Sequence, residues 1–133
     1  MTGIERLRPD GLVRSPAFSH VAIVPAGATT IYVGGQNAVD AEGSLVGAGD
    51  AAAQSARALA NVKTALAAAG ASVADVVQWT VLFVDGVDVA AAYGAIAADL
   101  ASDEPALVTS ALVAGLGVPG ALVEIAAVAA VIR

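Results

Sequence analysis

The stretch DAAAQSARALANVKTALAAAGASVADVVQWTVLFV, residues 50–84, contains two different hydrophobic repeats in immediate succession. In its first part, small and apolar side chains recur every three or four residues, which predicts one face of a helix. These side chains are Ala51, Ser55, Leu59, Val62, Leu66 and Ala69. Asp50 is the expected N-cap and Gly70 the expected residue after the helix end. The last part, residues 76–84, is β-branched and aromatic and predicts a buried strand.

The polar residues of this stretch divide between the outside of the helix and its connection to the strand. Gln54, Arg57 and Asn61 lie off the apolar stripe. Ser72 and Asp75 match a capping box, three residues apart, just before the strand.

Around this helix–strand unit, the remaining patterns predict four strands and a second helix. Residues 19–24 and 29–35 are strand-like and joined by the turn sequence PAGA, which predicts a β-hairpin. A second helix is expected from about Asp88, and two further strands over 107–114 and 121–132. The order β-β-α-β-α-β-β predicts an α+β fold with two helices packed on one sheet.

The composition predicts a single domain, over residues 1–133, that associates with copies of itself. Hydrophobic residues make up 58% of the chain but aromatic residues only 4%, so alanine and valine carry most of the apolar content. Each small side chain buries little area, at roughly 25 cal/mol per Å² of apolar surface. A chain of this kind gains from burying further surface between subunits, and we expect an oligomer.

Charge and residue usage disfavour several classes of function. The net charge is −6, and clustered Lys and Arg are what nucleic-acid binding requires, so we expect no nucleic-acid partner. The chain has no cysteine and a single histidine, which excludes a thiolate nucleophile and a multi-histidine metal site within one chain. Proline and glycine interrupt the apolar region 105–132, so we expect no membrane span. The charged start lacks the apolar core of a secretory signal, and a cytoplasmic protein is expected.

Two motifs imitate functional sites. GAGDAA, residues 47–52, resembles part of a dinucleotide fingerprint but lacks the strand before it and the acidic residue about 20 positions later. Loop glycines before an N-cap are the better interpretation. Ser19 and His20 are adjacent in a predicted strand and therefore point to opposite faces, so an ordinary sheet histidine is favoured over a catalytic pair.

Three other side chains have both a structural and a functional interpretation. Glu124 interrupts the otherwise apolar strand 121–132, where a buried carboxylate must be paired, hydrogen-bonded or protonated, and could serve in proton transfer. An exposed strand position is the alternative. Tyr93 belongs to the apolar stripe of the second helix, which predicts core packing. Phe18 fits either the core or a pocket wall.

The predicted strand 29–35 ends in two glycines, Gly34 and Gly35, and the amide side chain of Gln36 follows directly. Two glycines at this point indicate either a bulge or a backbone that a ligand approaches closely.

Four segments together resemble the RidA (YjgF) family, in order and spacing, from about residue 15 to 131. They are SPAFS at 15–19, IYVGGQNAVDAEG at 31–43, QSARALANVKTALAAAGASVADVV at 54–77 and VPGALVEIAAVA at 118–129. The resemblance implies a chorismate-mutase-like fold, with a six-stranded mixed sheet and two helices on one face. It also implies a homotrimer with ligand clefts between subunits. Better-known members hydrolyse enamines and imines to 2-oxo acids and ammonia without a metal or organic cofactor.

The same resemblance assigns roles to individual residues. Glu124 matches a glutamate thought to position water, and Gly35 and Gln36 match a cleft-lining segment in which many relatives have a serine at the place of Gly34. Phe18 stands where an aromatic residue is usual, and Tyr93 where relatives have an asparagine.

The arginine that clamps the substrate carboxylate in these relatives has no counterpart within residues 104–115. Leu107 or Val108 stands in its place, depending on the direction of counting. Three hypotheses follow: a divergent imine or enamine hydrolase for a less anionic ligand, a non-catalytic ligand-binding or scaffold trimer, or a residual deaminase that recruits Arg133 or another cation.

Overall fold

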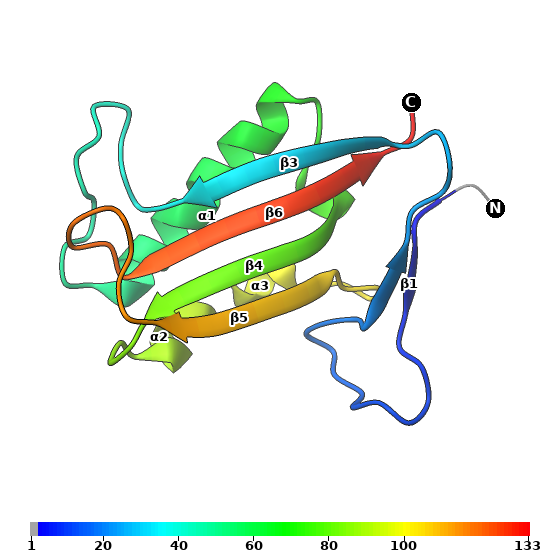
Figure 1. Cartoon of the computed structure of the whole chain (residues 1–133), viewed down its shortest axis with the longest axis horizontal. Coiled ribbons are helices and arrows are strands. Elements are labelled where there is room, and N and C mark those ends of the chain that lie inside the picture. The colour runs from blue at the N-terminus through cyan, green and yellow to red at the C-terminus, as the bar shows by residue number, and fades with distance from the viewer. Residues whose placement is uncertain (1–2) are drawn as a thin grey trace.

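The computed structural model describes residues 3–133, so the first two residues of the predicted domain 1–133 lie outside the described part. The elements, in chain order, are β1 (Glu5–Leu7), β2 (Val21–Ile23), β3 (Thr29–Gln36), α1 (Ala51–Ala68), the 3₁₀ turn η1 (Val73–Asp75), β4 (Val76–Val84), α2 (Val89–Gly94), α3 (Ala97–Leu100), β5 (Leu107–Val113) and β6 (Val123–Val131). The helices lie together on one face of the main sheet (Figure 1). The predicted α+β class is confirmed.

The main sheet is mixed, as expected, and has four strands in the order β3-β6-β4-β5. The β3–β6 and β6–β4 pairs are antiparallel, whereas β4 and β5 are parallel. The parallel pair requires a crossover, which α2 and α3 supply. The other two strands, β1 and β2, form a separate antiparallel ribbon, so the six strands divide into two sheets rather than one.

The predicted hairpin between residues 19–24 and 29–35 is wrong. β2 pairs with β1, whereas β3 pairs with β6, whose paired residues lie 89 or more positions later in the chain. The strand lengths explain the difference, because β3 has eight residues and β6 nine, while β2 has three. The longer partner offers β3 a longer ladder and a continuous apolar face.

The core lies between the helices and one face of the main sheet. Trp79 and Val81 of β4, Ile125 of β6 and Leu66 of α1 are all at most 1% exposed. Side chains alternate along each strand, so the residues between them point to the other face of the sheet, which no helix covers. Glu124 is one of these residues.

Helix α1 begins and ends as the sequence predicts. The Asp50 carboxylate accepts a hydrogen bond from the Ala53 N–H at 3.0 Å. At the other end, Gly70 adopts a φ of +74°, and the Ala71 N–H reaches back to the Leu66 carbonyl at 2.9 Å. Glycine is favoured there because L residues with a side chain rarely adopt a positive φ.

Gln54 lies off the apolar stripe of α1, yet its side chain is 0% exposed. Its amide nitrogen donates to the carbonyls of Gly47 and Gly120, and its amide oxygen accepts from the Leu122 N–H. Gln54 therefore supplies partners for backbone groups of two loops that pack on the start of α1. The spacing of apolar residues cannot identify a buried polar residue such as Gln54.

The second helix is interrupted, although its predicted start is right. The Asp88 carboxylate caps α2 through the Ala91 N–H at 3.0 Å. After α2, the Ile96 N–H bonds to the Tyr93 carbonyl three residues back, and the chain restarts as α3. The buried residues Ala92, Ile96 and Leu100 still form one stripe across both helices.

Candidate functional site

Glu124 lies on the uncovered face of the main sheet. Its neighbours Val123 and Ile125 are buried in the core, whereas Glu124 is half-buried and stands opposite Leu82 of β4. Within residues 3–133 its carboxylate has no hydrogen-bond or salt-bridge partner. Glu124 is thus intermediate between the buried and the exposed alternatives, and its carboxylate is free to interact with a ligand or another subunit.

The glycines of residues 34 and 35 form a β-bulge directly beside this carboxylate. Val33 pairs with Ala127 and Gln36 with Ile125, so β3 has one residue more than β6 in this interval. A Cβ atom added at Gly35 would lie 2.5 Å from Oε2 of Glu124, whereas one added at Gly34 would meet nothing within 4 Å. The two glycines thus form a bulge and also allow a close approach to the backbone, but the group that approaches Gly35 is the Glu124 side chain.

Gln36 completes the bulge through its own side chain. Its amide nitrogen donates to the Gly34 carbonyl at 3.1 Å, so the side chain folds back over the two glycines. This contact orients the bulge, and the Gln36 amide oxygen remains available as an acceptor.

A chain of amide contacts, which the sequence patterns did not reveal, holds the bulge in place. The buried Asn37 donates to the Val123 carbonyl at 3.1 Å, next to Glu124. Asn61 of α1 donates to the carbonyls of Asn37 and Val39, and its own amide oxygen accepts from Arg57. Asn37 and Asn61 are 24 residues apart in the sequence, so no local pattern links them and only the folded chain reveals the network.

Phe18, Tyr93 and Val108 come together at a second location, on the helix side of the sheet. They line a hollow of about 620 Å³ near α2 and β5. The remaining lining residues are Ala17, Phe83, Val89, Ala90, Gly94 and Ser110. Besides backbone groups, the hollow thus offers two polar side-chain groups, the hydroxyls of Tyr93 and Ser110. It is an apolar pocket with a few polar contacts, which is typical of a small-molecule site.

Leu107 and Val108 point to opposite faces of the sheet. Val108 is paired with Trp79, a core residue, and lines the pocket with Phe18 and Tyr93. Leu107 is paired with Gln78, whose other neighbour is Val128 of β6 on the uncovered face. The two residues that sequence counting left as alternatives therefore belong to different surfaces.

The candidate residues thus form two groups that one chain does not bring together. Glu124, Gly35 and Leu107 lie on the uncovered face, whereas Phe18, Tyr93 and Val108 lie on the helix side. A small ligand bound to a single chain would touch only one of the groups.

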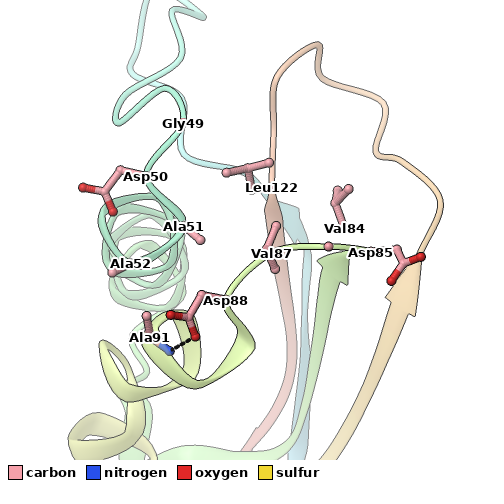
Figure 2. Close-up of a pocket in the computed structure, with 11 residues that line it drawn as sticks. Gly49, Asp50, Ala51, Ala52, Val84, Asp85, Val87, Asp88, Ala91 and Leu122 are labelled. Atoms are coloured by element: carbon pink, nitrogen blue, oxygen red, sulfur yellow. Dashed lines mark hydrogen bonds between the residues drawn. The ribbon is translucent and has the colours of Figure 1, made fainter.

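A further hollow, of about 750 Å³, lies where α1 and α2 begin, beyond the end of β4 (Figure 2). Its carboxylates are Asp50, Asp85 and Asp88. Asp50 and Asp88 are already hydrogen-bonded as helix caps. Gly49 precedes α1 in a loop, so the interpretation of GAGDAA as loop glycines is confirmed. None of the site residues predicted from sequence lines this hollow.

His20 has a structural role, although it lies in a bend just before β2 and not in the predicted strand. Its Nε2 lies 2.6 Å from the Val13 carbonyl, and its ring packs edge-on against Phe18 with centroids 5.4 Å apart. Among residues 3–133, no three His, Asp or Glu side chains gather as metal ligands would. In the same part of the chain, no helix is long and apolar enough to cross a membrane.

Replacing Gly35 by alanine is expected to move the Glu124 carboxyl group by about 1 Å, because carbon contacts relax to about 3.5 Å or more. The stability cost should stay below about 1 kcal/mol, since the displaced atoms are the far end of a flexible side chain. Gly34→Ala is the matched control and should leave both the carboxyl position and the melting temperature unchanged. Crystal structures and melting curves of the two variants measure this, and an unmoved carboxyl group in Gly35→Ala would contradict the contact.

Comparisons with known proteins place the chain among small α+β proteins. Residues 12–131 match the family described as endoribonuclease L-PSP. The Rid-family protein YyfB from Yersinia pestis is 33% identical, with a TM-score of 0.86, over 98% of this chain and 100% of that chain. The YjgF gene product of E. coli is 30% identical over 75% and 79% of the two chains, with a TM-score of 0.64. E. coli TdcF, solved with bound serine, is 28% identical over 83% and 84%, with a TM-score of 0.66. No curated protein matches the chain.

Proposed function

Because this chain belongs to the Rid (YjgF) family, we propose that it forms a homotrimer that binds a small molecule in clefts between subunits and hydrolyses an imine or enamine there. The observation that carries the proposal is the separation of the candidate residues into two groups on opposite faces of one sheet. A cleft between subunits lets Glu124 and Gly35 of one copy face Phe18, Tyr93 and Val108 of the next. The protein acts in the cytoplasm under this proposal.

The uncovered face of the main sheet supports self-association. Leu82, Leu107 and Val128 lie on this face and are only half-buried in the single chain, and Tyr32 beside Val128 is 80% exposed. A sheet face with this many apolar side chains is stabilised by burial, at roughly 25 cal/mol per Å². A second copy of the chain supplies that cover.

Glu124 is the proposed catalytic residue. Its free carboxylate accepts a proton from a bound water as the water oxygen attacks the imine carbon, and returns that proton to the nitrogen to give a carbinolamine. The hydroxyl proton then passes through Glu124 to the nitrogen, the carbon–nitrogen bond breaks, and a carbonyl compound and ammonia leave. The backbone at Gly34, Gly35 and Gln36 holds polar atoms of the ligand, because a bulge leaves backbone groups outside the ladder. Phe18 and Tyr93 form the walls of the cleft. The proposed chemistry uses no metal and no organic cofactor.

The family's description as an endoribonuclease is not part of the proposal. The chain carries six basic and twelve acidic residues, which repels a phosphate backbone. Five of the basic side chains are also engaged within the chain: Arg6, Arg8, Arg57, Lys63 and Arg133. Small-molecule binding fits these charges better than nucleic-acid binding does.

A non-catalytic ligand-binding or scaffold trimer is the alternative. It is favoured by Leu107 and Val108, since neither can bind a substrate carboxylate as the arginine of better-known relatives does. Recruitment of Arg133 as a substitute has less support, because its guanidinium donates to the Ala69 carbonyl at the end of α1.

The trimer is tested by mass. Native mass spectrometry or light scattering is expected to give a particle of three times the 12.9 kDa chain. Chains at micromolar concentration should stay associated, because a large apolar interface is nearly always permanent. A monodisperse particle of 12.9 kDa would overturn the shared cleft.

The reaction class is tested with imines generated in situ from serine or threonine. Without an arginine, we expect ammonia release at least about tenfold slower than by arginine-bearing relatives, because a lost contact to a charged group costs 1.4 kcal/mol or more. E. coli YjgF and TdcF provide the reference rates under the same conditions. Ammonia release as fast as by the relatives would contradict a divergent hydrolase for a less anionic ligand, and would favour recruitment of another cation in place of the arginine.

A further inference from the structure

The charged side chains around the proposed cleft determine which ligand charge it can bind. We infer that the cleft takes an apolar amine or its iminium ion, a cation without a carboxylate, and that this cation pairs with Glu124 while its hydrocarbon part occupies the pocket of Phe18, Tyr93 and Val108. The inference rests on the proposed function and narrows it to a substrate class. Three observations support it: the contacts of the basic side chains, the unpaired carboxylate of Glu124 and the apolar lining of the pocket.

Hardly any basic side chain is free to bind an anion. Arg6 donates to the Val76 carbonyl, Arg8 to that of Asp103 and Arg133 to that of Ala69. Arg57 donates to Asn61, and Lys63 forms a salt bridge with Asp99. Arg14 is the remaining one in residues 3–133, and it is exposed and does not line the pocket. Within residues 3–133, no basic side chain lines the pocket with Phe18, Tyr93 and Val108, so a carboxylate bound there has no cationic partner from the same chain.

Glu124, in contrast to these basic side chains, has a charged group that is free to bind a ligand of opposite charge. Its carboxylate leans against the bare Cα of Gly35 and has no partner among residues 3–133. The chain as a whole carries a net charge of −6, which adds to the attraction of cations. An ammonium or iminium group satisfies this carboxylate, whereas a carboxylate ligand is repelled by it.

The lining of the pocket determines which hydrocarbon part of the ligand fits. Phe18, Phe83 and Tyr93 contribute three aromatic rings, and Val89 and Val108 contribute branched aliphatic groups. A volume of about 620 Å³ accommodates a phenyl ring or a branched alkyl chain. The side-chain hydroxyls of Tyr93 and Ser110 are neutral, so they compensate neither a positive nor a negative ligand charge.

The corresponding reaction is the hydrolysis of an iminium ion derived from an amine. Water adds its oxygen to the iminium carbon and gives one proton to Glu124, which leaves a neutral carbinolamine. Glu124 then returns this proton to the nitrogen, the carbon–nitrogen bond breaks, and the hydroxyl proton passes through Glu124 to the departing ammonia. The products are an aldehyde or ketone and an ammonium ion, and no oxidant or reductant is consumed. An amine-oxidising reaction must supply this substrate, since it is the step that converts an amine into an imine.

Binding is tested with two stable probes of one skeleton, 2-phenylethylamine and 3-phenylpropanoate. Calorimetry on the intact oligomer is expected to give at least about tenfold tighter binding of the amine, because a charge-assisted pair adds 1.4 kcal/mol or more. Glu124→Gln should remove the preference, Val108→Arg should reverse it, and Arg14→Ala should leave it unchanged. Equal or tighter binding of 3-phenylpropanoate, or no binding of either probe, overturns the inference.

Turnover separates this inference from the proposed function. The iminium ions made by an amine oxidase from 2-phenylethylamine and by an amino-acid oxidase from phenylalanine differ only by a carboxylate. Faster ammonia release from the first, relative to a protein-free control, supports the inference. Faster release from the second overturns the ligand class but keeps the hydrolase. If the amine binds and neither imine is accelerated, the ligand class stands and the hydrolase is wrong.

Discussion

Glu124→Gln is expected to slow imine hydrolysis by a factor of about 10² to 10⁴, the usual contribution of a positioned general base. Glutamine keeps the size of the side chain and its place beside Gly35, so the loss falls on proton transfer rather than on folding. The measurement is kcat/KM for ammonia release, with the melting temperature recorded for each variant. The imines of 2-phenylethylamine and of serine are both used, so that the result does not depend on one ligand class.

Glu42→Gln is the matched control for charge, because Glu42 is exposed in the turn between β3 and α1. We expect it to leave kcat/KM and the melting temperature unchanged. Glu124→Asp withdraws the carboxylate from Gly35 by one methylene and should give an intermediate rate. A rate for Glu124→Gln equal to that of the original protein would remove Glu124 from the mechanism.

Gln54→Met is expected to destabilise the protein by about 3 kcal/mol, the cost of buried polar groups left unpaired. Methionine has a similar volume but cannot bond to the carbonyls of Gly47 and Gly120 or to the Leu122 N–H. The melting temperature should fall by roughly 10 °C for a chain of this length. Thermal and urea unfolding, followed by circular dichroism, measure the change.

The neighbouring residue provides the control. Ser55 is also 0% exposed, but its hydroxyl has no hydrogen-bond partner within residues 3–133. Ser55→Ala should therefore change stability by less than about 0.5 kcal/mol, or raise it slightly, since alanine also favours the helix. A comparable loss in both variants would mean that packing, rather than the hydrogen bonds of Gln54, stabilises this end of α1.

Local signals were sufficient to predict the helices and strands in which they lie. Asp50 and Gly70 bound α1 because a cap and a left-handed residue act on adjacent backbone groups. The same reasoning failed for the hairpin of β2 and β3, because a turn signal favours a local pairing and carries no information about β6. It also missed the roles of Gln54, Asn37 and Asn61, because most of their partners lie between 22 and 86 residues away.

Periodicity, caps and spaced motifs were enough to predict the α+β class and the family, and to select the individual candidate residues. Which of these candidates are neighbours became clear only from the pairing of the strands. The tertiary structure placed Gly35 against Glu124 through the antiparallel pairing of β3 with β6, and it sent Leu107 and Val108 to opposite faces. The physical reason is the pleat of a strand, which alternates side chains between faces, together with a register set by residues distant in the chain.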